Sequence, residues 1–344
     1  MTELLQKNAD QNLTNCAAKN FNGIDLIKFI CAFLVCIIHV DPLPQTLFPA
    51  AANINFILQQ GLCRIAVPFF FMASGFFLFK EMGPGAVNRE KIRTYCFKLL
   101  RLLGIWTVLL RTGDMGHLWY LGATVVAVTV LGALLRRGMK YSHLFVLASG
   151  LYLIGLLDDS YYGLIYPLEK ISVLAYGIKA YHFLFWSTRN GLFMGFIFVL
   201  IGAFLANHTV QINIKTSVCC FVISTLLMLA EVLVLKHLSF QKDYNMTVFL
   251  LPTSFFFFNI AANMNLKDSK IYKRLRVLGV MLFFLHQLID LYIGLFLEAV
   301  VMFMGMDLAV FRLPLVLVIS LAIGLIVEHI SKHEKFQWLR WLYC

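Results

Sequence analysis

The stretch "KFICAFLVCIIH", from Lys28 to His39, places an ionisable residue at each end of ten otherwise apolar residues. If the stretch is an α-helix, its eleven steps of about 100° make three turns plus roughly 20°, so both side chains point the same way. A rise of about 1.5 Å per residue separates them by roughly 16 Å, about half of a bilayer's hydrocarbon thickness. The stretch therefore predicts one helix face with a cation and an imidazole at two depths of a membrane.

The composition of the chain supports a membrane setting. Of its 344 residues, 60% are hydrophobic and 14% are charged, whereas soluble domains hold roughly 25% charged residues. The first 23 residues are polar and lack the apolar core of a cleavable signal peptide, so we expect the first membrane helix to be the targeting signal. These features predict an all-α, multi-pass membrane protein.

Apolar segments predict a polytopic bundle of about ten transmembrane helices in one domain, residues 24–329. A cytoplasmic tail, 1–23, precedes it, and a basic amphipathic tail, 330–344, follows it on the inner leaflet. Most Lys and Arg residues fall on loops that face inward if the N-terminus is cytoplasmic, which predicts that both termini are cytoplasmic. The predicted spans are 24–40, 62–79, 95–110, 118–135, 142–157, 191–206, 217–235, 247–262, 277–300 and 307–329.

Membrane orientation also explains the formal net charge of +11, so the charge gives no reason to expect a nucleic-acid partner. No metal site is expected, because the chain contains no HExxH pair and its eight Cys lack metal-ligand spacing. Asp158 and Asp159 are expected to cap a solvated outer loop.

With this orientation, Lys28 lies near the cytoplasmic end of the first helix and His39 near its outer end. Ionisable groups inside a membrane are costly and usually face a bundle interior or a wet cavity, so both are site candidates. The residues leave an alternative open. Lys28 would then snorkel to the inner headgroups and pair with Asp25, while His39 would sit at the outer interface.

Further polar side chains gather at the level of His39, on several helices. Each has a plain explanation alone, because Arg at a helix end pairs with headgroups and "HLWYL" resembles an interfacial aromatic anchor. In "MLFFLHQLID", a buried structural histidine bonded to a carbonyl or to Asp290 is as reasonable as a functional one. The candidates for substrate binding or support are Asp41, Arg64, His117, Trp119, Tyr120, Arg189, Asn190 and His286.

Small residues mark the second predicted span. "MASGFF" places Ser74 and Gly75 in the middle of a Phe-rich segment. A glycine there permits close approach of a neighbouring helix or of a ligand, and packing alone would explain it.

The chain resembles the acyltransferase 3 family of integral membrane acyltransferases over nearly its whole length. The resemblance rests on the order Lys28 to His39, "RIAVPFFFMASGFFLF", "HLWYL", "RNGLFMGFIFVLIGAFLA" and "MLFFLHQL". It is strongest for the branch that includes surface-glycan O-acetyltransferases and the membrane domain of vancomycin-resistance serine racemases. The family signature is an Arg, ten residues and a His; here Lys28 stands where Arg is usual.

The resemblance implies transfer of an acyl group, usually acetyl, from cytoplasmic acetyl-CoA to a hydroxyl of an extracytoplasmic glycan, in the bacterial cytoplasmic membrane. It implies that His39 is the general base or the transient acyl carrier, and that Lys28 helps to hold the CoA phosphates. Ser74 and Gly75 are further candidates for donor binding. Expected partners are membrane lipid and a cell-envelope glycan, and a second copy of the chain is a further candidate.

Two departures from the family pattern keep other functions open. Lys28 lacks the planar two-pronged donor of Arg, although Lys remains a point-charge ligand for phosphate. The segment before "HLWYL", RTGDMGH, is also shorter than in relatives. A transporter of a small polar solute such as an amino acid, or a catalytically silent membrane module, would use the same polar layer.

Overall fold

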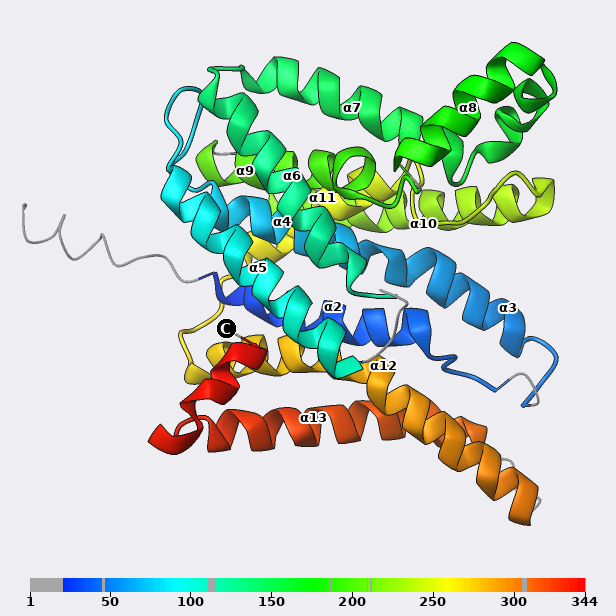
Figure 1. Ribbon diagram of the computed structural model, residues 1–344, viewed down its shortest axis with the longest axis vertical. Helices are drawn as coiled ribbons and strands as arrows, with labels where there is room; N and C mark the ends of the chain where they lie inside the picture. The colour runs from blue at the N-terminus through cyan, green and yellow to red at the C-terminus, as the bar shows by residue number, and fades with distance from the viewer. Residues whose placement is uncertain are drawn as a thin grey trace, which may run out of the picture.

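The computed structural model describes residues 21–44, 47–110, 116–185, 187–208, 210, 212–304 and 308–343. Regular structure throughout these residues is helical, as Figure 1 shows. The elements are α2 (Asn22–His39), α3 (Ala51–Phe56), η1 (Ile57–Gly61), η2 (Leu62–Ile65), α4 (Ala66–Leu78), α5 (Arg89–Leu110), α6 (Trp119–Arg136), α7 (Tyr141–Asp158), η3 (Tyr162–Leu164), η4 (Tyr166–Lys170), α8 (Ser172–Phe185), η5 (Gly191–Gly195), α9 (Phe196–Asn207), α10 (Ile214–Leu238), α11 (Leu250–Asn263), α12 (Lys270–Met304), η6 (Ala309–Phe311), α13 (Arg312–Ile330) and η7 (Glu334–Leu342).

Every predicted span corresponds to helical structure, and the all-α membrane architecture is confirmed. Among the described residues, seven helices are long and apolar enough to cross a membrane. The segments of α5, α9 and α11 are not among these seven. The crossing of the membrane by about ten helices and the cytoplasmic position of both termini therefore stay predictions, and residues 1–20 of the predicted tail lie outside the described residues.

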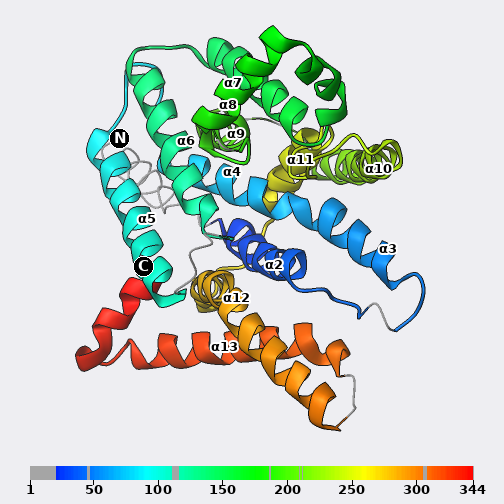
Figure 2. The ribbon, with the colours of Figure 1, turned by 45° about the vertical axis from the view of Figure 1, so that its right-hand side comes forward.

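Helix α2 lies in the interior of the bundle, between α4 and α12, in both Figure 1 and Figure 2. Helix α12 packs against α2 on one side and α13 on the other, α4 packs along α9, and α10 packs along α11. Most of α2 is therefore enclosed by protein, and Lys28 is partly buried, whereas His39 at the C-terminal end of the helix is exposed.

Glycines hold α4 close to α9. A Cβ atom at Gly75 would overlap the carbonyl of Val199, and one at Gly202 would overlap the carbonyl of Met72. Each glycine thus lets the opposing backbone approach to contact distance. Of the two explanations for Gly75, packing is the one that this contact supports.

The N-terminal ends of α2 and α12 are joined by an ion pair. Arg276 Nε donates to Asp25 Oδ1 at 3.0 Å, and Arg276 Nη2 donates to Asp25 Oδ2. The alternative in which Asp25 pairs with Lys28 is wrong, because Arg276 occupies the carboxylate. The Lys28 ammonium instead lies 4.6 Å from the ring centre of Phe77.

Helix α10 carries a buried carboxylate on the side that faces the bundle and exposed apolar residues on the side that faces away from it. Its buried Glu231 accepts hydrogen bonds from the backbone N–H groups of Val248, at 2.7 Å, and Phe249, at 3.0 Å, just before α11 begins. These donors have no partner within α11 itself, so the carboxylate caps that helix. Outward-facing residues of α10 such as Leu226 are exposed, as expected for a surface that contacts lipid.

Candidate active site

Three histidines from distant parts of the chain meet inside the bundle. His39 ends α2 and is exposed, His117 lies two residues before the start of α6 and is buried, and His286 lies in the middle of α12 and is buried. The ring centres of His39 and His117 are 6.4 Å apart, those of His39 and His286 are 5.4 Å apart, and those of His117 and His286 are 4.8 Å apart. The structure therefore brings together three of the predicted site residues.

The amide of Gln287 connects two of these rings. Its Oε1 lies 2.6 Å from His117 Nδ1, and its Nε2 lies 3.3 Å from His39 Nδ1. With this amide orientation, His117 Nδ1–H donates to the amide oxygen, and the amide nitrogen donates to His39. Sequence reasoning missed Gln287, and the available signal was its position beside His286 in "LHQL".

The remaining nitrogens of His117 and His286 have unused hydrogen-bonding capacity. His286 Nδ1 donates to the backbone carbonyl of Phe283 at 2.8 Å. Asp290 is instead held by Arg312, at 2.7 and 3.0 Å, so the carbonyl is the correct alternative for His286. The Nε2 atoms of His117 and His286 are buried and have no hydrogen-bond partner among the described residues. Such atoms are available to a ligand.

Burial determines the protonation state of His117, which lies outside the membrane-spanning helices. It lowers the pKa of His117 from its usual value near 6.5 to about 4, and the hydrogen bond to Gln287 opposes this shift only in part. His117 is therefore neutral at neutral pH. A neutral imidazole can accept a proton from a substrate hydroxyl.

A central cavity of about 40 Å³ lies beside this cluster. This volume holds a small number of water molecules or one small group. Within it the Arg189 guanidinium lies 5.3 Å from the ring centre of Trp119. The predicted site residues that line the central cavity are His39, Arg64, His117, Trp119, Tyr120 and Arg189.

A break in regular α-helix places Arg64 in the central cavity. The helical run through residues 51–78 contains a π-helical turn, η1, followed by the 3-10 turn η2, and Arg64 lies in the latter. Its guanidinium donates to Gln60 and Asn245, and at 3.3 Å to Asp243. These polar partners compensate for the cost of burying a cation.

The prediction that Asp159 caps a solvated outer loop is wrong. The side chain is buried and accepts a hydrogen bond from the Met246 backbone N–H at 2.7 Å. Burial and, to a smaller extent, the neighbouring Asp243 together raise the pKa of Asp159 to about 7, although Arg64 opposes the shift. The side chain of Asp158 is also largely buried, at 10% exposed, and forms an ion pair with Lys242 at 2.6 Å, so the prediction of a solvated position is wrong for both residues.

An inner cavity of about 350 Å³ approaches the same cluster from the Lys28 end of α2. Its cations are Lys28, Lys98 and Arg276, and Ser74 also lines it, as do Tyr95, Tyr120 and Phe283. Gly75 is not among its lining residues, in agreement with its packing against α9.

Hydroxyl groups and an aromatic wall separate the inner and central cavities. Tyr95 donates to the Ser74 hydroxyl at 2.9 Å, and the Tyr120 hydroxyl lies 3.2 Å from the same atom. Tyr120 and Phe283 line both cavities. The two spaces are therefore separated by single side chains.

An outer cavity of about 350 Å³ lies on the other side of His39, between α2, α5, α12 and α13. Its polar lining comprises His39, Gln287, Asp290, Glu298 and Arg312. His39 thus lines both the central and the outer cavity.

Two predicted residues lie beside these cavities. Asp41 accepts a hydrogen bond from Gln59 at 2.9 Å, just beyond the outer end of α2. Asn190 caps the π-helical turn η5, where its side-chain oxygen accepts from the backbone N–H groups of Leu192, at 2.8 Å, and Phe193, at 3.1 Å. Neither residue lines the central, inner or outer cavity.

Comparison with known protein families decides how the N-terminal part of this site is classified. A family model described as an acyltransferase domain matches residues 21–113, which carry Lys28, His39, Arg64 and Ser74. The resemblance to the acyltransferase 3 family is confirmed. The matched residues include α2, α4 and α5, and of these helices α2 and α5 supply Lys28 and Lys98 to the inner cavity.

Curated relatives agree with the predicted branch of that family. The chain is 30% identical over 269 residues to an amino-acid racemase of Enterococcus faecalis, an alignment that covers 70% of this chain and 36% of the relative. It is 29% identical over 290 residues to a serine/alanine racemase of Enterococcus gallinarum, covering 77% of this chain and 40% of the relative. The chain therefore spans less than half the length of these relatives. No solved structure gives a significant match.

Proposed function

We propose that the chain is a membrane-bound O-acyltransferase that moves an acetyl group from cytoplasmic acetyl-CoA to a hydroxyl of an extracytoplasmic glycan. The observation that carries the proposal is the shared wall of Tyr120 and Phe283, which leaves the inner cavity one side chain away from the cavity of His39. A donor arriving from the Lys28 end and an acceptor arriving from the outer cavity would meet at that imidazole.

The inner cavity has the chemistry that a CoA thioester requires. Lys28, Lys98 and Arg276 supply positive charge for its phosphates, and Lys serves phosphate as a point charge. The aromatic and aliphatic walls suit the pantetheine arm. The Ser74 hydroxyl donates to the Phe70 carbonyl at 2.9 Å and is contacted by Tyr95 and Tyr120, so the oxygens of the two tyrosines are the groups that would accept a hydrogen bond from an amide N–H of that arm.

The histidine cluster provides the proton transfer that the reaction needs. The acceptor oxygen forms a bond to the thioester carbonyl carbon, and the bond between that carbon and the CoA sulfur breaks. The acceptor proton passes to an imidazole of the cluster and then to the departing thiolate, so an ester and free CoA are formed. Arg64 and Arg189, which line the central cavity, would stabilise the negative charge that develops on the carbonyl oxygen.

The outer cavity suits a hydroxylated acceptor. Glu298 and the ion pair of Asp290 with Arg312 offer hydrogen-bond acceptors and donors to sugar hydroxyls. His39 at its inner end would receive the hydroxyl that reacts.

The test is acetyl transfer by the purified full-length chain. Labelled acetyl-CoA and a cell-envelope glycan fraction should yield acetylated glycan and free CoA. His39→Ala should abolish both products, because general acid–base catalysis typically contributes about 10²-fold or more. His143→Ala, which removes an exposed histidine of α7, should keep the wild-type rate. Full activity of His39→Ala would refute the proposed role.

The names of the relatives support one second candidate function. Both are named as amino-acid racemases, and the cavities at the two ends of α2 would also suit a carrier of an amino acid. Uptake of a labelled amino acid into liposomes that lack acetyl-CoA would favour this carrier. Absence of both uptake and transfer would favour a catalytically silent module.

A further inference from the structure

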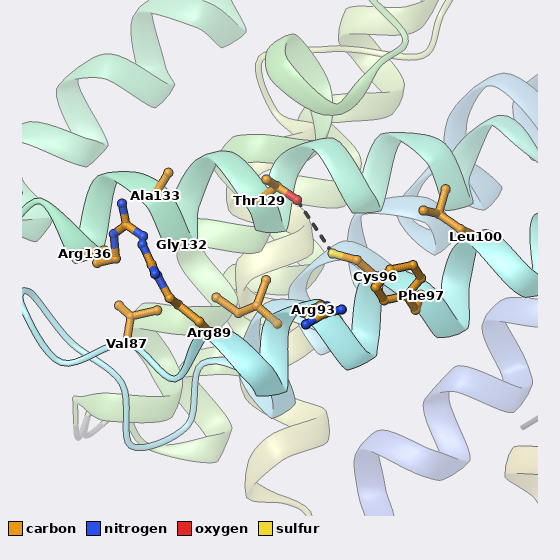
Figure 3. A pocket seen from close by; sticks show the side chains of 11 residues that line it. Val87, Arg89, Arg93, Cys96, Phe97, Leu100, Thr129, Gly132, Ala133 and Arg136 are labelled. Atoms are coloured by element: carbon orange, nitrogen blue, oxygen red, sulfur yellow. Dashed lines mark hydrogen bonds between the residues drawn. The ribbon is translucent and has the colours of Figure 1, made fainter.

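A groove on the periphery of the bundle belongs to none of the cavities described above. It lies between α5 and α6, has a volume of about 330 Å³, and is shown in Figure 3. We call it the α5–α6 groove; among its lining residues are Arg89, Ile92, Phe97, Leu100, Gly132 and Arg136.

One end of the α5–α6 groove carries positive charge without a carboxylate to balance it. Arg89 begins α5 and Arg136 ends α6, and Figure 3 shows their side chains extending toward one another. The neighbouring Glu90 lies 3.7 Å from Arg93, and no ion pair joins Arg89 or Arg136 to a carboxylate of the described residues. Two guanidinium groups at one point attract an anion, and phosphate matches their geometry.

The rest of the α5–α6 groove is apolar. Phe97 is 59% exposed and Leu100 is 46% exposed, so this face of α5 points away from the bundle. Gly132 and Ala133 of α6 add little bulk, which leaves a furrow between the two helices. The predicted orientation puts the arginine end at the cytoplasmic surface and the furrow in the hydrocarbon of the inner leaflet.

We propose that the α5–α6 groove binds one anionic phospholipid of the inner leaflet. Its phosphate would sit between Arg89 and Arg136, and one acyl chain would lie along Phe97 and Leu100. Charge complementarity selects an anionic lipid over a zwitterionic one, because three arginines line the groove and, among the described residues, only Arg93 is paired with a carboxylate.

The bound lipid would steady the wall of the inner cavity. The opposite face of α5 supplies Tyr95, Lys98 and Leu102 to that cavity. Helix α5 carries several cations and is not among the seven helices that qualify as membrane spans, so its own composition holds it in place weakly. An effect of the lipid on the KM for acetyl-CoA rests on the proposed function, whereas binding of the lipid does not.

The experiment measures lipid retention and thermal stability of the full chain in nanodiscs. Discs of phosphatidylglycerol should give a higher unfolding temperature than discs of phosphatidylcholine. Native mass spectrometry should find one retained phosphatidylglycerol. Arg89→Gln and Arg136→Gln should each weaken retention roughly fivefold, as one lost charge near an anionic surface implies. Arg137→Gln, which removes an adjacent arginine outside the groove, should retain the lipid as the wild type does.

Each other outcome would overturn the proposal. Equal retention of phosphatidylcholine and phosphatidylglycerol would show that charge does not select the lipid. Wild-type retention by a variant that carries both Arg89→Gln and Arg136→Gln would show that the two arginines do not bind it. Stabilisation by free glycerol phosphate alone would point to a phosphate site instead of a lipid site. The wild-type comparison of lipids needs no variant, so misfolding of a variant would not prevent a decision. None of these readouts depends on acetyl transfer.

Discussion

The inner and central cavities differ in volume and in how their polar groups are satisfied. The inner cavity encloses about 350 Å³, and its hydroxyl groups bond one another through Ser74. The central cavity encloses about 40 Å³, and two of the imidazoles beside it keep a buried nitrogen that has no partner in the described part of the chain. Polar groups that hydrogen-bond one another are suited to lining a binding site. Polar groups without a partner in a confined space are suited to contacting a reacting group.

This difference assigns separate kinetic effects to the two regions. Substitutions at the inner cavity should change the KM for acetyl-CoA, and substitutions around the histidines should change kcat. The following tests can contradict this assignment of KM effects to the inner cavity and kcat effects to the histidines, or make it more specific.

The largest effect is expected for Gln287→Leu. The variant keeps the approximate volume but loses both hydrogen bonds that orient His39 and His117, so kcat should fall roughly 10²-fold. Steady-state kinetics of CoA release would measure it. Gln287→Glu keeps the acceptor for His117 and loses the donor to His39, so its loss should be smaller. A change in KM alone would contradict the assignment of Gln287 to the chemical step.

A smaller effect is expected for Lys28→Gln in the inner cavity. Loss of one charged contact to phosphate should raise the KM for acetyl-CoA about tenfold and leave kcat nearly unchanged. Lys28→Arg restores the charge and adds the two-pronged geometry, so its KM should equal the wild-type value or fall below it. A fall in kcat with unchanged KM would place Lys28 in the chemical step instead.

The pH dependence of the rate tests the protonation of the histidine cluster. If His117 is the base, its pKa of about 4 means that kcat/KM should change little between pH 7 and pH 6. A base with the usual pKa near 6.5 would lose about two-thirds of its active form over the same interval. A steep decline below neutral pH would show that the essential base is not buried as His117 is.

The smallest effect concerns stability at the outer edge of the central cavity. Because the pKa of Asp159 is raised to about 7, the folded state binds more protons than the unfolded state between about pH 4 and pH 7. Stability should therefore fall as the pH rises through that window and level off above it. Asp159→Asn keeps an acceptor for the Met246 N–H and should flatten the dependence of unfolding temperature on pH. An unchanged slope would assign the pH dependence to another group.

Much of the fold could be predicted because apolar length marks membrane helices directly. The eleven-residue spacing of Lys28 and His39 likewise predicted that one helix would serve both the inner and the outer half of the site. Local capping was harder to foresee. Asn190 was grouped with substrate-binding candidates, but its side chain stabilises the start of η5.

Pairings between distant residues could not be predicted, because spacing along the chain carries no information about them. Asp25 pairs with Arg276, which follows it by 251 residues, while the Lys28 ammonium lies over the ring of Phe77. Gln287 has no charge that would mark it, and its role emerges only when α2 and α12 are packed together. Asp159 resembled a loop residue until the Met246 N–H and the neighbouring Asp243 were placed around it.

The side-chain amide of Gln287, which lies between His117 and His39, has one oxygen and one nitrogen. Its orientation therefore fixes the tautomers of both histidines together. A half-turn about its terminal bond exchanges the two atoms, after which His39 must donate through Nδ1 and His117 must accept. The proton-accepting nitrogen at the reaction centre would then pass from one ring to the other. The orientation of the uncharged Gln287 side chain would in this way determine whether His39 or His117 acts as the base.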